Sequence, residues 1–169
     1  MQKNSNLRSS TIIIGIDPGS KRIGYGIIEK TGSRLKFVDA GLLGISVETK
    51  QGTLIETKKH LETLIKKFNP SLLAVEKLYF SKNQKTALSV SENRGVIILV
   101  ASENNLQIQE YSPNEVKQSV TGYGLADKKA VFKMVKIILN KPDLKIIDDA
   151  SDALALAIIA SQKSNILRC

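Results

Sequence analysis

Four acidic residues lie where an apolar segment ends or where a helical segment begins. Asp17 closes the apolar run TIIIGID, and Glu76 closes the run LLAVE. Asp149 and Asp152 lie at the start of the last helical segment, and their spacing of three residues places them on one face of a helix. Because carboxylates are costly inside a protein core, acids that close buried strands require an explanation.

Convergence of these carboxylates would create a site for hard divalent cations. Three or four acids in a small volume repel one another, and their pKa values rise. A Mg²⁺ ion removes that repulsion, because it binds a few carboxylates together with water and phosphate oxygens. Two such ions can hold the attacking water and the leaving oxygen during in-line cleavage of a phosphodiester. The acids therefore indicate metal-dependent phosphodiester chemistry.

Taken singly, the acids also have ordinary structural interpretations. Aspartates at a helix start commonly cap the helix or complement its dipole, and this is the favoured interpretation of Asp148, which lies in the expected cap position. Capping is also the safer interpretation of Asp149 or Asp152 considered alone. Asp17 precedes Pro-Gly and could form an Asx turn. Only the joint placement of the acids favours metal binding.

The net charge of the chain points to a polyanionic partner. Its 169 residues include 25 Lys and Arg against 16 Asp and Glu, a formal net charge of +9. This excess suits nucleic acid or an anionic membrane surface, although the lysines could merely be solvated. The N-terminal segment lacks the features of a secretory signal, the longest apolar run (95–101) is too short to span a bilayer, and the single cysteine, Cys169, permits no internal disulfide. We expect a cytoplasmic protein.

The hydrophobic periodicity predicts one α/β domain with a mixed sheet. Strands are expected at 11–17, 23–29 and 34–45, forming an antiparallel meander, and again at 72–76 and 106–111. Helices are expected at 51–69, 84–104 and 113–118, after an Asp127 cap, and from 148 or 149 to 162. The domain should span 11–163, with a disordered N-terminal extension over 1–10 and a tail over 164–169.

This arrangement of strands would bring two of the acids together. If the strands that end in Asp17 and Glu76 are adjacent and parallel, both carboxylates emerge at the same edge of the sheet. In open α/β sheets that edge is where ligands bind. The last helix would then have to place Asp149 and Asp152 beside them.

Several motifs, in the same order along the chain, resemble those of RuvC-type junction resolvases. GIDPGSKRIGYG begins at Gly15, LLAVEKLYFSKNQKTAL contains Glu76, and DASDALALA begins at Asp149. NRGV (93–96) and YSPNEVKQSVTGYGLADKK lie between the last two, and the similarity extends over 12–161. The resemblance implies a ribonuclease H-like fold with a five-stranded mixed sheet flanked by helices. It also implies a homodimer, built largely on the helix over 84–104, that makes paired symmetric nicks in four-way (Holliday) DNA junctions during recombination and repair.

The resemblance further implies which residues act. The acids that bind metal in the family fall on Asp17, Glu76, Asp149 and Asp152. The expected ions are Mg²⁺, two per active site, with Mn²⁺ able to substitute, and a metal-bound water is the expected nucleophile.

Contacts to DNA are implied in the same way. Basic positions near the scissile phosphate fall on Lys117 and Lys128, where an ammonium could neutralise charge that develops on the phosphate. Tyr79 and Phe80 lie where the family has an aromatic that stacks on junction bases, and Tyr79 is expected to reach DNA while Phe80 packs. Lys82 follows as a further expected DNA contact. A RuvAB-type branch-migration complex is an expected partner.

Three other functions remain open at this point. The pattern IDPG…GYG is also reminiscent of the phosphate-binding hairpin of actin-like ATPases and sugar kinases, but those need two related domains, and GxxxxGK[ST] is absent. A ribonuclease H-like enzyme acting on RNA or another branched nucleic acid would differ in substrate competition. A junction-binding protein without activity would show no metal-dependent cleavage.

Overall fold

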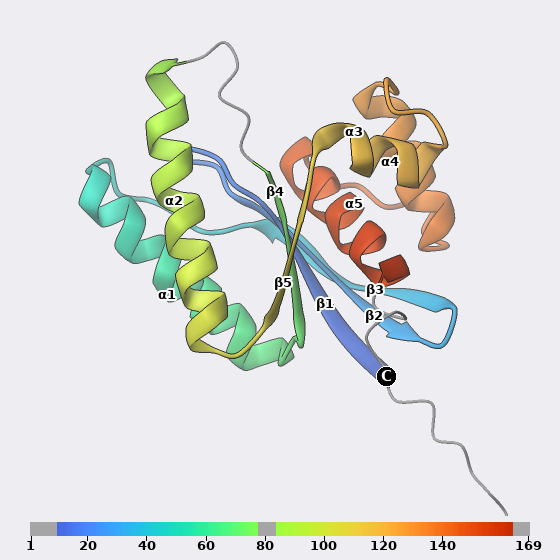
Figure 1. Ribbon diagram of the computed structural model, residues 1–169, viewed down its shortest axis with the longest axis horizontal. Coiled ribbons are helices and arrows are strands. Elements are labelled where there is room, and N and C mark those ends of the chain that lie inside the picture. Colours follow the sequence, from blue (N-terminus) through green and yellow to red (C-terminus); the bar gives the residue numbers. More distant parts are fainter. Residues whose placement is uncertain (1–9, 78–83, 164–169) are drawn as a thin grey trace, which may run out of the picture.

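The computed structural model describes residues 10–77 and 84–163 of the chain. Over these residues the elements follow in the order β1 (Ser10–Asp17), β2 (Gly24–Thr31), β3 (Arg34–Leu42), α1 (Lys50–Phe68), β4 (Leu72–Glu76), α2 (Gln84–Glu103), β5 (Gln107–Tyr111), α3 (Pro113–Thr121), α4 (Lys128–Ile138) and α5 (Asp148–Lys163). Figure 1 shows a central sheet with helices on both sides. Among the described residues, no helix is both long and apolar enough to cross a membrane.

The five strands form one mixed sheet in the order β3-β2-β1-β4-β5. β1 to β3 are an antiparallel meander, as expected from the sequence. β4 pairs in parallel with both β1 and β5. Ile16 is opposite Val75 in this register, so Asp17 and Glu76 each lie one residue further along two neighbouring parallel strands. The structure confirms the adjacency that was conditional in the sequence.

Both faces of the central strands are buried, which explains their uninterrupted apolar sequences. Ile13 packs in a core beneath α3, α4 and α5, whereas its neighbour Ile14 packs in a second core beneath α1 and α2. Side chains that alternate along a strand point to opposite faces, so a strand covered on both sides must be apolar at every position. β1 and β4 can therefore expose a polar side chain only at their ends.

Capping residues set several helix ends at the positions expected from the sequence. Asn69 caps the C-terminal end of α1 in a left-handed conformation with φ 47°. Ser112 caps α3 in a capping box with Glu115, and Asp127 caps α4 by accepting from the backbone N–H of Ala130.

Other boundaries differ from the expected ones for reasons of pairing and backbone conformation. β1 begins at Ser10, inside the expected extension, because that residue pairs with Thr31 of β2. β3 ends at Leu42 instead of 45, because Leu42 pairs with Gly24, where β2 begins. α3 continues past 118 to Thr121, because Gly122 (φ 79°) is the residue that provides its left-handed end.

Candidate active site

A cavity of about 360 Å³ opens at the carboxyl ends of β1 and β4. Side chains from five elements line it, from β1, β4, α3, α4 and α5. The charged ones are Asp17, Glu76, Asp152, Lys117 and Lys128. The structure therefore brings together three of the four expected acids and both lysines expected near the scissile phosphate, from segments that are far apart in the sequence.

The acids in this cavity disfavour each other's charge. Burial, the largest cause, and the nearby carboxylates of Glu76, Asp152 and Asp149 together raise the pKa of Asp17 to about 7, against the smaller opposing effect of Lys128. Burial and Asp152 likewise raise the pKa of Glu76, against the opposing effect of the two lysines. Two neighbouring carboxyl groups that resist ionisation are typical of a site that needs an added cation.

Lys128 neutralises one of the acids on α5. Its Nζ lies 2.7 Å from Asp152 Oδ2, and this hydrogen bond raises the pKa of Lys128. Because α4 begins at Lys128 directly after its Asp127 cap, the start of that helix sets the position of the Lys128 backbone.

Asp149 contacts a cation that the sequence analysis did not identify. Arg22 Nη2 lies 2.7 Å from Asp149 Oδ2, and Arg22 Nε donates to the same oxygen at 3.0 Å. Arg22 is in the loop between β1 and β2, five residues after Asp17. The signal available in the sequence was the pair of basic residues in GSKR, directly after the strand that ends in an acid. Asp149 does not line the cavity, but its charge acts on Asp17.

The position of Asp148 differs from the expected one. The first backbone hydrogen bond of α5 runs from Ser151 N–H to the carbonyl of Ile147, so Asp148 is a residue of the first turn instead of the cap. Its side chain is exposed, and there its charge complements the helix dipole. The interpretation of Asp148 as a dipole complement therefore holds, whereas its placement as the cap is wrong by one residue.

The acids have the right chemistry for a hard cation, but their carboxylates do not surround a common point in this structure. Within residues 10–77 and 84–163, no group of three or more Asp, Glu, His or Cys side chains is close enough together to hold a metal ion. Two of the three acids of α5 are instead in ion pairs, Asp149 with Arg22 and Asp152 with Lys128. Tyr79, Phe80 and Lys82 lie outside the described residues.

Close packing of α5 against the sheet sets the position of Asp149. A Cβ atom added to Gly24, the first residue of β2, would lie 2.1 Å from the backbone oxygen of Asp149 and 3.0 Å from its Cβ. A Cβ at Gly15 of β1 would likewise lie 2.0 Å from the carbonyl oxygen of Ala153. Only glycine allows the helix backbone to approach the strands this closely.

We therefore expect Gly24→Ala to displace the start of α5 and to lower the free energy of unfolding by about 1–3 kcal/mol, the usual range for overpacking. Urea denaturation measures the effect. Gly44→Ala is the matched control, because its Cβ would meet only the His60 ring, at 3.5 Å and beyond. The control should change stability by less than about 0.5 kcal/mol. Equal stability of the two variants would contradict this account of the packing.

Comparisons with known proteins agree with the fold and with the motifs. A family model described as crossover junction endodeoxyribonuclease RuvC matches residues 13–160. The protein of that name from Caldicellulosiruptor saccharolyticus is 47% identical over 148 residues, which cover 86% of this chain and 89% of that protein. The one from Roseiflexus sp. is 40% identical over 161 residues, which cover 95% and 96%.

Two solved structures are similar over almost the whole chain. Thermus thermophilus RuvC matches with a TM-score of 0.82 and 26% identity, over 92% of this chain and 96% of that chain. The same protein in complex with a Holliday junction substrate matches with a TM-score of 0.80 and 27% identity, over 88% and 91%. The fold is thus the expected ribonuclease H-like fold, with a mixed five-stranded sheet and helices on both faces. On the joint ground of motifs, fold and sequence identity, the chain belongs to the RuvC family of crossover junction endodeoxyribonucleases.

Proposed function

We propose that this protein is a metal-dependent endonuclease that resolves four-way DNA junctions by paired symmetric nicks, in homologous recombination and DNA repair. The observation that carries the proposal is the meeting of Asp17, Glu76 and Asp152 with Lys117 and Lys128 in one cavity. Family membership supports it, because the relatives are named crossover junction endodeoxyribonucleases and a similar structure holds a Holliday junction substrate. That membership also argues against the nucleotide-cleft alternative.

The four acids would hold Mg²⁺, two ions per site, through carboxylate oxygens. When bound, Mg²⁺ would polarise the scissile phosphate and lower the pKa of the attacking water. The raised pKa values of Asp17 and Glu76 support this assignment, because an added cation stabilises carboxylates that otherwise resist ionisation. Mn²⁺ should substitute, since it accepts the same oxygen ligands in octahedral geometry.

Metal binding would change the ion pairs that Arg22 and Lys128 form with the acids of α5. Arg22 and Lys128 contact only Oδ2 of Asp149 and Asp152, and a metal ion bound to these carboxylates would weaken both ion pairs. The ammonium of Lys128 is then free to face the DNA phosphate across the cavity, where Lys117 also lies. Both lysines would neutralise charge that develops on the phosphate during cleavage. Tyr79, Phe80 and Lys82 are proposed as further DNA contacts on the resemblance alone.

A homodimer would supply the second active site that paired nicks require. The outer face of α2 carries Leu88 and Leu99, which are 61% and 54% exposed, with the exposed Gly95 between them on the same side of the helix. A small residue between two large apolar ones allows a second helix to approach closely. We propose that this face is the dimer interface. A RuvAB-type motor as partner and a cytoplasmic location rest on family membership alone.

Leu99→Glu is expected to weaken the dimer by about 10–100-fold, which corresponds to about 1.4–2.7 kcal/mol. The reason is that it places a charge within the proposed apolar interface. Sedimentation equilibrium over a range of protein concentrations measures the dissociation constant. Ile137→Glu on α4 is the matched control, because Ile137 is about as exposed (59%) as Leu99 but lies in the opposite layer of helices. The interface is misassigned if the control dissociates the dimer and Leu99→Glu does not.

A cleavage assay on a synthetic four-way junction tests the proposed function. The protein is incubated with the junction or with linear duplex of the same sequence, in Mg²⁺, Mn²⁺ or EDTA. Paired nicks in the junction alone, only with a divalent metal, are the expected result. Cleavage of an RNA–DNA hybrid in preference to the junction would favour the alternative substrate class. Junction binding without any cutting would contradict the enzymatic part of the proposal.

A further inference from the structure

The motif NRGV over 93–96 has no role in the site described so far. Its first two residues, Asn93 and Arg94, lie near the middle of α2, which packs on the face of the sheet opposite α5 (Figure 1). Neither side chain lines the cavity that holds the acids. Both nevertheless reach backbone atoms next to the strand acids.

Asn93 holds the loop that follows Asp17. Its side chain is 1% exposed, and Nδ2 donates to the backbone oxygens of Gly19 at 2.9 Å and Ser20 at 3.0 Å. On the other side, the hydroxyl of Thr57 in α1 lies 3.5 Å from Asn93 Oδ1. The amide is therefore fixed by its surroundings, and it satisfies two loop carbonyls that have no strand partner.

Arg94 holds the residue that ends β4. Its Nε donates to the backbone oxygen of Glu76 at 3.0 Å, and its Nη2 forms an ion pair with Glu110 of β5. The Arg94 side chain is only 16% exposed, whereas Glu110 is 43% exposed. One guanidinium thus joins the carboxyl ends of two neighbouring strands, at the point where the backbone of Glu76 leaves the sheet.

We propose that Asn93 and Arg94 are positioning residues that hold the carboxylates of Asp17 and Glu76 at the separation that metal binding requires. Two adjacent residues of one rigid helix fix the backbone after one acid and the backbone of the other acid. The spacing of the two strand ends is therefore set by α2 as well as by the sheet. This inference rests on the proposed metal-binding role of the two acids. Partners of this kind, which do not touch the ion, typically change metal affinity by about 10–100-fold when they are removed.

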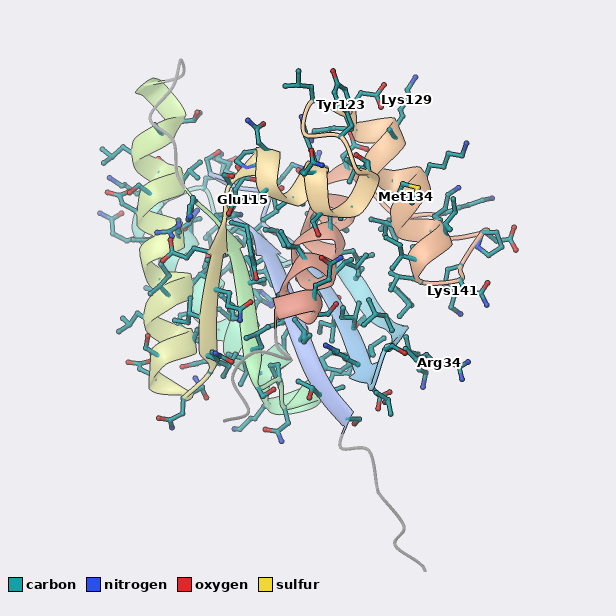
Figure 2. All side chains as sticks on the ribbon, turned by 45° about the vertical axis from the view of Figure 1, so that its right-hand side comes forward. Arg34, Glu115, Tyr123, Lys129, Met134 and Lys141 are labelled. Atoms are coloured by element: carbon teal, nitrogen blue, oxygen red, sulfur yellow. The ribbon has the colours of Figure 1, made fainter. Side chains whose placement is uncertain are left out.

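The test uses Asn93→Ala and Arg94→Lys in the full chain. Asn93→Ala removes the amide. Arg94→Lys keeps the positive charge but loses the guanidinium group that contacts Glu76 and Glu110 at the same time. Two matched controls change the same residue types elsewhere. Asn104→Ala removes an asparagine directly after α2, whose Nδ2 donates to the Val100 oxygen in the last turn of that helix. Arg34→Lys changes an exposed arginine at the opposite end of the molecule from Tyr123 and Lys129 (Figure 2).

The primary readout is Mn²⁺ binding without DNA, measured by calorimetry or electron paramagnetic resonance on protein whose folded fraction is known from circular dichroism. Both variants should bind Mn²⁺ at least about 10-fold more weakly, whereas the controls should match the wild-type protein. In cleavage, the half-saturating Mg²⁺ concentration should rise, high Mg²⁺ should recover part of the rate, and junction affinity in EDTA should stay unchanged.

Folded variants that bind Mn²⁺ as tightly as the wild-type protein would overturn the proposal, because a purely structural role lowers stability without moving metal affinity. If Asn93→Ala does not fold, Arg94→Lys and Asn93→Ser give the same readout. Failure of the proposed function would be seen in the wild-type protein instead of the variants. A wild-type protein that binds Mn²⁺ but cuts no junction refutes the substrate, while weaker Mn²⁺ binding by the variants still supports the positioning role. A wild-type protein that binds no Mn²⁺ overturns both.

Discussion

Asp17→Asn is expected to abolish junction cleavage, lowering the rate by about 1,000-fold or more, which is about 4 kcal/mol of activation free energy. Asp17 is the acid on which the others act most strongly, since Glu76, Asp152 and Asp149 all raise its pKa. An amide keeps the size of the side chain but cannot supply the negative charge that the proposed divalent ion would need between these groups. The rate of product formation on a four-way junction in Mg²⁺, under single-turnover conditions, measures the loss.

Junction binding by the same variant should survive. The lysines that face the cavity are unchanged, and removal of a negative charge beside the phosphate can only favour the polyanion. Binding is measured by fluorescence anisotropy in EDTA. Asp143→Asn, in the exposed segment between α4 and α5, is the matched control and should cut at the wild-type rate. Loss of binding together with cleavage would show that Asp17 is a structural residue instead of a metal ligand.

The second large effect concerns stability in the absence of metal. The folded protein holds the Asp17 carboxyl at a pKa of about 7 against an ordinary value of 3.8, so folding favours the protonated form. The contribution of Asp17 to stability is therefore fully present below about pH 4 and is lost as the pH rises towards 7. Above pH 7 both states are ionised, and the penalty stays constant.

Asp17→Asn should consequently be more stable than the wild-type protein at pH 8 in EDTA, by on the order of 2–4 kcal/mol. At pH 4 the difference should be small, because the wild-type carboxyl is protonated in the folded state and, with its ordinary pKa of 3.8, about half protonated in the unfolded state. Lys128 does not titrate in this window, since its pKa is raised from 10.5. Urea denaturation at each pH gives the free energies of unfolding.

Mg²⁺ should reverse the order of stabilities at pH 8. Binding to the folded wild-type protein stabilises it by mass action, while the variant has lost a ligand and should gain little. Asp143→Asn again serves as the control and should follow the wild-type protein at every pH and metal concentration. A wild-type protein whose stability in EDTA is flat between pH 4 and pH 8 would show that Asp17 is not held in its protonated form.

Short-range physics made much of the site predictable. Asp17 and Glu76 stand out because a strand buried on both faces is apolar until its end, so the first acid marks the edge of the sheet. The helix starts at Ser112 and Asp127 follow from side chains that bind backbone N–H groups three residues away. The spacing of Asp149 and Asp152 follows from the helical repeat. All of these depend only on neighbours within a few residues.

The sequence by itself thus determined which acids lie at strand ends and helix starts, and the order of its motifs indicated the family. Only the tertiary structure decided that β1 and β4 are adjacent and parallel, which is what brings Asp17 beside Glu76. It alone showed the pairing of Arg22 with Asp149 and the hold of Asn93 on Gly19, which join residues 127 and 74 positions apart. Contacts at such separations depend on strand order and on how closely α5 and α2 pack against the sheet. Neither the strand order nor the closeness of this packing can be read from the hydrophobic periodicity of the sequence.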